Sequence, residues 1–169
     1  MATVGTGAPR ARLDTDHSFP RRPTILMAMT TAAIVRRVDI RASPERVWAV
    51  LSDVERWHEW TASISRVRLY TGSPIEVGSR AIVKQPRLPA AHWLVTDVDP
   101  GHGFVWVSIG PGLMVTARHA IEPVAEGCRV TLSLDYSGFM SGLLLRLTRG
   151  ISTRYVDLEA EGLKARAES

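Results

Sequence analysis

The feature that most constrains the fold is a long apolar stripe at the carboxyl end of the chain. Residues 142–167 contain no proline, and their apolar side chains recur at steps of three and four residues. The stripe consists of Leu144, Leu147, Ile151, Tyr155, Leu158 and Ala165. This spacing predicts one amphipathic helix. About 26 residues that rise about 1.5 Å each give a helix of roughly 39 Å, which is long enough to cross a whole sheet.

Short β-rich runs precede this helix. They are separated by turn sequences rich in Gly and Pro, which lie at 71–74, 86–89, 99–103, 110–112 and 125–127. The last run alternates apolar with polar residues, and its apolar members are Val130, Leu132, Leu134 and Tyr136. This pattern predicts an antiparallel sheet with one face in water and the other covered by the long helix.

Two helix-start signals follow the first strand-like run, residues 34–41. Ser43 followed by Pro44 is typical of an N-cap and a first helical residue. Ser52 and Glu55 have the spacing of a capping box, which predicts a second short helix. The predicted order is therefore one strand, two short helices, about six strands and one long helix.

These elements predict an α+β fold in which an antiparallel sheet of about seven strands is covered by the C-terminal helix. We assign this domain to residues 31–169. Residues 1–30 are rich in Pro, Gly, Arg and Thr and lack periodicity, which indicates a disordered tail or an extension upstream of a start at Met27 or Met29. A signal peptide is the less favoured interpretation, because Thr residues dilute the apolar run.

Composition disfavours several classes of function. The net charge of +4 includes no Lys/Arg run of the kind that marks a nucleic-acid interface, so no nucleic-acid partner is expected. No apolar segment is long enough to span a membrane. The single cysteine, Cys128, excludes an internal disulfide and indicates a cytoplasmic protein. No metal is expected, because the histidines lack the spacing of metal ligands. The glycine-rich patterns that bind phosphate are also missing, which disfavours nucleotide-dependent chemistry.

Several stretches of the chain resemble a known family. They are IRASPERVWAVLSDVERWHEW, EVGSR, HWLVTDVDPGHGFVWV and RHAIEPVAEGCRVTLSLDY, followed by the long terminal helix. Together, from about Ile34 to Ala167, they resemble the START-like helix-grip superfamily (SRPBCC), and within it the polyketide cyclase/dehydrase and lipid transport group. The resemblance implies a helix-grip fold, in which the curved antiparallel sheet wraps around the C-terminal helix. It also implies a hydrophobic cavity between sheet and helix that takes a lipid, a polyketide or an aromatic compound without a cofactor.

The expected cavity residues come from the aromatic-rich helices, the alternating strands and the helix stripe. They are Trp57, Trp60, Trp93, Trp106, His119, Leu147 and Ile151. Trp57 and Trp60 lie three residues apart on one helix face. Two interpretations of this pair are open, packing in the core and a place at the cavity rim, because both bury an apolar face. A one-residue slip in strand register would move a whole strand face outward.

His119 is the candidate catalytic residue, because it interrupts an otherwise apolar strand face. Two interpretations are open: a buried histidine whose nitrogens are satisfied by neighbours, and a group that orients a ligand or moves a proton. No carboxylate in the sequence is evidently placed to orient or recharge His119, which favours the first. Cys128 follows a turn glycine with no histidine near it, so we expect it to be inert.

Three functions are consistent with these observations. The first is binding of a hydrophobic small molecule. The second is a polyketide cyclase/aromatase-type enzyme that uses His119 as acid and base. The third is an interaction module for a protein or a ribosome, and a homodimer is also left open. The abundance of apolar and aromatic residues at the expected cavity positions favours binding.

Overall fold

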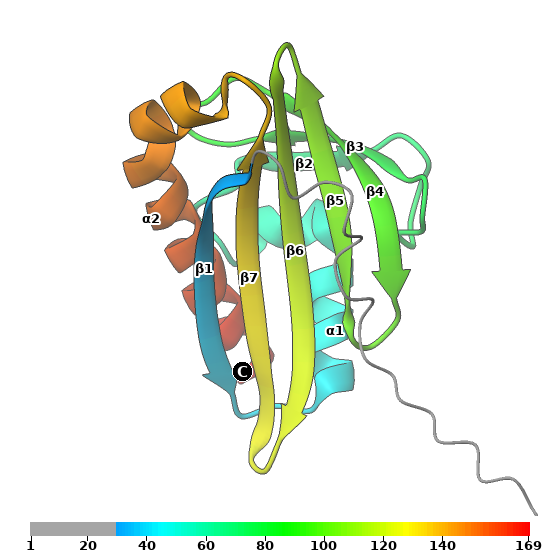
Figure 1. The fold of residues 1–169 in the computed structure, drawn as a ribbon. Helices are drawn as coiled ribbons and strands as arrows, with labels where there is room; N and C mark the ends of the chain where they lie inside the picture. Colours follow the sequence, from blue (N-terminus) through cyan, green and yellow to red (C-terminus); the bar gives the residue numbers. More distant parts are fainter. Residues whose placement is uncertain (1–29) are drawn as a thin grey trace, which may run out of the picture.

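The computed structural model describes residues 30–169 (Figure 1). Except for Thr30, the tail expected over residues 1–30 lies outside the described residues, together with Met27 and Met29. The elements in chain order are β1 (Thr30–Ile40), α1 (Pro44–Ser52), η2 (Val54–Glu59), β2 (Arg66–Leu69), β3 (Arg80–Lys84), β4 (Ala91–Asp99), β5 (Gly103–Gly110), β6 (Leu113–Val124), β7 (Gly127–Ser137) and α2 (Ser141–Ala167).

One seven-stranded sheet has the order β1-β7-β6-β5-β4-β3-β2. Every neighbouring pair is antiparallel, so β1 closes one edge by pairing with β7 while β2 to β7 form a meander. The alternation predicted for β7 is confirmed, because Val130, Leu132 and Tyr136 are buried while Arg129 is exposed. The predicted fold class is therefore correct.

Local sequence explains where α1 begins but not how η2 is held. The Ser43 hydroxyl accepts a hydrogen bond from the Arg46 N–H at 3.3 Å, and Pro44 is the first helical residue, as predicted. The capping box predicted for Ser52 and Glu55 does not form, because η2 is a 3₁₀ helix without a side-chain cap. The Glu55 carboxylate instead accepts a bond from the Leu69 N–H at 3.0 Å and ties η2 to β2.

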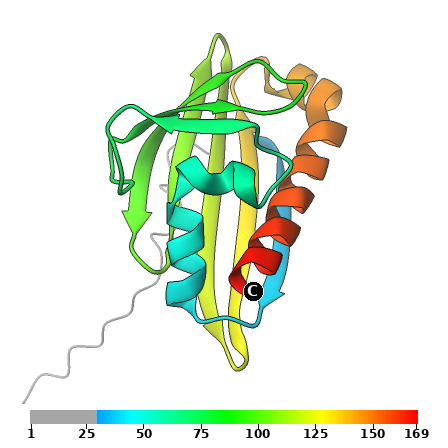
Figure 2. The same ribbon diagram turned by 180° about the vertical axis from the view of Figure 1, so that it is seen from behind.

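All three helices lie on the same side of the sheet (Figure 2). Helix α2 runs along β1, to which it is joined by an ion pair between Arg36 and Asp157. Its bounds agree with the predicted helix over residues 142–167 to within one residue. No helix in residues 30–169 has the length and apolar character needed to cross a membrane.

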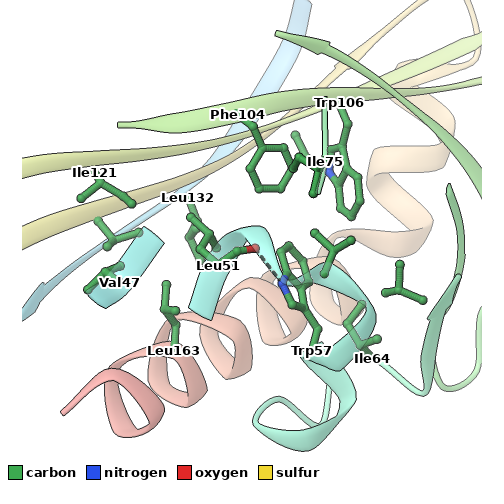
Figure 3. Close-up of a cluster of buried hydrophobic side chains, with 14 of the residues drawn as sticks. Val47, Leu51, Trp57, Ile64, Ile75, Phe104, Trp106, Ile121, Leu132 and Leu163 are labelled. Carbon is green, nitrogen blue, oxygen red and sulfur yellow. Dashed lines mark hydrogen bonds between the residues drawn. The ribbon is translucent and has the colours of Figure 1, made fainter. Parts of the chain in front are cut away.

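Trp57 lies at the centre of the buried cluster between these layers (Figure 3). Its side chain is 1% exposed, and its indole N–H donates to the Leu51 carbonyl oxygen at 2.9 Å. A buried indole needs such a partner, because its N–H has lost water. The bond fixes η2 against the end of α1, and the half-buried Trp48 packs against the same cluster.

Candidate functional site

A cavity of about 310 Å³ lies between the inner face of the sheet and α2. The strands contribute Val83, Ala91, Trp93, Trp106, Ser108, Leu113, Val115, Ala117, His119, Leu134 and Tyr136. Helix α2 contributes Leu144, Thr148, Ser152, Tyr155, Val156 and Glu159. The remaining lining residues are Trp57, Ile64, Gln85, Leu88 and Pro89. The lining is thus mainly apolar and aromatic, with a small set of polar groups.

Four of the expected residues lie on this cavity: Trp57, Trp93, Trp106 and His119. Strand register explains the three that come from the sheet. Trp106 is paired with Ala117, and His119 is paired with Phe104, so their side chains share the inner face. The Trp93 and Trp106 rings pack with their centroids 5.1 Å apart. These aromatic groups form a continuous wall.

The expectation that Leu147, Ile151 and Trp60 line the cavity is wrong. The Leu147 side chain is 72% exposed, because the inner face of α2 contains Thr148 and Ser152. Each of these follows a predicted residue, Leu147 or Ile151, by one position, which is a rotation of about 100° around the helix. Ile151 is only partly buried and is not among the lining residues.

Trp60 is not among the residues that line the cavity. Its ring centroid is 5.5 Å from that of Trp57, and its backbone faces α2 at Gly162. The side chain borders a shallow surface pocket of about 120 Å³, which it shares with Arg56, Glu59 and other residues. The two tryptophans therefore differ: Trp57 lines the cavity, whereas Trp60 packs against the Trp57 ring and borders the surface pocket.

His119 is held in an aromatic enclosure and paired with a carboxylate. Its ring stacks on Phe104 at a centroid distance of 4.3 Å, and the Trp57 and Trp106 rings approach it edge-on. Its Nε2 lies 3.1 Å from Oε1 of Glu159, and its side chain is 4% exposed. Its Nδ1 is buried and has no hydrogen-bond partner.

Glu159 is the functional candidate that sequence reasoning missed. Its pairing with His119 is not evident from local sequence, because the two residues lie 40 positions apart and meet only when α2 packs on the sheet. A signal was present, since Glu159 follows Ser152 and Tyr155 at helical spacing. The side chain of Glu159 is 13% exposed. Because His119 Nδ1 is enclosed, Glu159 is the member of the pair that presents a polar group to the cavity.

Three hydroxyl groups of the cavity donate hydrogen bonds to protein partners. Tyr136 donates to the Ser152 hydroxyl at 2.9 Å, and Thr148 donates to the Leu144 carbonyl oxygen at 2.7 Å. The Tyr155 hydroxyl donates to the Pro86 carbonyl oxygen and so ties the β3–β4 loop to α2. Among the described residues the lining contains no Lys or Arg, and Glu159 is its one carboxylate.

Other reactive groups do not assemble into a second centre. Cys128 is fully buried, and burial raises the pKa of its thiol, with Asp39 and Glu45 adding to the rise. A protonated, enclosed thiol is a poor nucleophile. Within residues 30–169, no three His, Cys, Asp or Glu side chains come together as a metal site.

A curved antiparallel sheet that grips a long helix over an internal cavity defines the helix-grip class of proteins. The chain belongs to the polyketide cyclase/dehydrase and lipid transport family, whose pattern it matches over residues 31–168. A comparison with curated proteins found no match.

Solved structures share the fold at low sequence identity. Hypothetical protein jhp0584 from Helicobacter pylori is 14% identical with a TM-score of 0.74, over 90% of this chain and 98% of that one. A norcoclaurine synthase point mutant from Thalictrum flavum, in complex with a transition-state analogue, is 13% identical with a TM-score of 0.64, over 83% and 96%.

A third similar structure is the di-domain ARO/CYC protein StfQ from the steffimycin biosynthetic pathway. It is 14% identical to this chain, with a TM-score of 0.63 over 80% of the present sequence. The chain spans only 50% of the StfQ chain. At these identities the likeness establishes the fold alone.

Proposed function

We propose that the protein binds a hydrophobic small molecule, a lipid, a polyketide or an aromatic compound, in the cavity between the sheet and α2. The observation that carries this proposal is the cavity of about 310 Å³, with its tryptophan wall and few polar groups. Ligand sites of globular proteins have this character and begin at about this size. Membership of the family supports the same class of ligand.

Native mass spectrometry of the protein purified from its own host tests whether the cavity is filled. We expect a mass increment above that of the chain, which disappears on denaturation and corresponds to an apolar molecule. Repeated recovery of the empty protein, together with a co-purifying macromolecule, would instead favour the interaction-module alternative.

A pair of leucine variants on α2 tests the location of the site. Leu144→Trp places a large ring into the cavity, so we expect affinity for a neutral probe, methylnaphthalene, to fall by about tenfold or more in calorimetric titration. Leu147→Trp is the matched control, because Leu147 is 72% exposed and outside the lining. Equal affinities for the two variants would place binding elsewhere.

A second candidate function is acid/base chemistry on the bound molecule, as in an enzyme of the cyclase/aromatase kind. The observation that favours it is the contact of 3.1 Å between His119 and Glu159 at an enclosed, mainly apolar site. Acid/base residues are commonly tuned by such surroundings. In this arrangement Glu159 is the group that meets the ligand, and His119 is a positioning residue behind it, which differs from the role expected for His119 from the sequence.

A further inference from the structure

The carboxylate of Glu159 is under-supplied with hydrogen-bond donors. Its contact with His119 is its one hydrogen bond within residues 30–169, although a carboxylate has about four acceptor sites. The side chain is 13% exposed and lines the cavity. Burying a carboxylate is costly unless donors replace the lost water. Glu159 therefore has acceptor capacity that a ligand can use.

The proton arrangement of the pair favours an ionised Glu159. A protonated Glu159 that donated to His119 Nε2 would leave a proton on Nδ1, which is buried without a partner. Orphaned buried donors are rarer than under-satisfied acceptors. With the proton on Nε2, His119 donates to the carboxylate and Nδ1 carries only a lone pair. The pair then has a net negative charge.

The rest of the lining does not offset this charge. Among the described residues it contains no Lys or Arg, and the hydroxyl groups of Tyr136, Tyr155 and Thr148 donate to other protein atoms. Its other polar groups carry no charge: the side chains of Gln85, Ser108 and Ser152, and the indole N–H of Trp106, which is buried without a partner. A ligand with its own carboxylate would meet like charge in a region of low dielectric. An ammonium group would instead meet opposite charge.

We propose that the cavity selects apolar ligands that carry a hydrogen-bond donor, a hydroxyl or an ammonium group, and rejects those that carry a carboxylate. The donor binds Glu159, and the apolar body lies against the wall formed by Trp93 and Trp106. This inference rests on the proposed binding function and specifies the class of ligand. Fatty acids are thereby excluded, whereas hydrophobic alcohols, phenols and amines are favoured.

Four naphthalene probes with the same ring body test this selectivity. They carry a methyl, a hydroxymethyl, an aminomethyl or a carboxylate substituent, and their affinities are measured by calorimetry at neutral pH. We expect the aminomethyl and hydroxymethyl probes to bind about tenfold tighter than the methyl probe, and the carboxylate probe to bind about tenfold weaker. The wild-type ranking tests the proposal without any variant.

Two glutamate variants assign the selectivity to one side chain. Glu159→Gln keeps the size of the residue and removes its charge, so the ratio of aminomethyl to carboxylate affinity should fall by about tenfold or more. Glu161→Gln makes the same change in net charge at an exposed position of α2 outside the lining, and should leave the ratio unchanged.

The outcomes separate this inference from the binding function on which it rests. If the methyl probe binds and the carboxylate probe binds at least as tightly as the alcohol, the inference is overturned and the binding function stands. If none of the four probes binds, both are overturned. An equal response of the ratio to Glu159→Gln and Glu161→Gln would also overturn the assignment to Glu159.

Discussion

Gly162→Ala is expected to lower the free energy of unfolding by about 2 kcal/mol, although alanine is the better helix former. A Cβ atom at Gly162 would lie 2.1 Å from the backbone oxygen of Trp60 and 3.0 Å from its carbonyl carbon. The close approach to rigid backbone puts the overpacking cost at about 3 kcal/mol, the upper end of the usual range, and a gain of about 1 kcal/mol in helix propensity leaves a net loss of about 2 kcal/mol. The corresponding fall in Tm is about 4–8 °C.

Gly150→Ala in the same helix is the matched control and should have the opposite sign. Gly150 is exposed, and a Cβ there meets nothing within 4 Å. The substitution should stabilise the protein by about 0.5–1 kcal/mol. Both variants are compared with wild type by denaturant unfolding followed by circular dichroism. A Gly162→Ala protein as stable as Gly150→Ala would show that η2 and α2 are not in close contact.

The contact at Gly162 also helps to position Trp57 in the cavity wall. Because the backbone of Trp60 sits against α2, η2 is held where the Trp57 ring packs between Trp106 and His119. Loosening this contact should displace Trp57 from the cavity wall. The same glycine thus connects the stability of the fold to the shape of the site.

Most of the fold could be predicted because its signals are local. Period-two alternation identified the inner face of β7, and Ser43 with Pro44 fixed the start of α1. The absence of proline and the helical spacing of apolar residues gave the bounds of α2. These signals depend on neighbouring residues, which a single sequence displays directly.

The cavity face of α2 could not be predicted in the same way. The cavity face of α2 is mixed rather than a continuous apolar stripe. Leu144 and Tyr155 from the predicted stripe do line the cavity, together with Thr148, Ser152 and Glu159, whereas Leu147 faces outward. The first turns of α2 are apolar on several sides, so hydropathy could not distinguish the orientations.

The pairing of His119 with Glu159 and the use of Glu55 by Leu69 have a common explanation. Both are contacts between elements far apart in the chain, at 40 and 14 positions. Local spacing predicted a capping box between Glu55 and Ser52, which does not form, and it predicted no partner for His119. In each case tertiary packing placed the carboxylate beside a donor that local sequence patterns do not reveal.

The acid/base candidate makes the prediction with the largest expected effect. If the bound molecule is also a substrate, Glu159→Gln should lower kcat by about 10² to 10⁴, the usual contribution of a general acid or base. Glutamine keeps the size of the side chain but cannot exchange a proton, so turnover should be lost even when the ligand is saturating. Turnover is assayed with the molecule that co-purifies with the wild-type protein.

His119→Gln distinguishes a positioning residue from the group that transfers the proton. Glutamine can still donate to Glu159, so kcat should fall less than in Glu159→Gln, and the double variant should be no slower than Glu159→Gln alone, because residues that act as a unit are non-additive. Affinity in His119→Gln should stay within about tenfold, or about 1.4 kcal/mol. A greater loss of kcat in His119→Gln than in Glu159→Gln would reverse the two roles. If the wild-type protein binds the molecule and leaves it unchanged, His119 and Glu159 serve only to recognise the ligand. The protein would then be a carrier whose buried carboxylate selects its ligand.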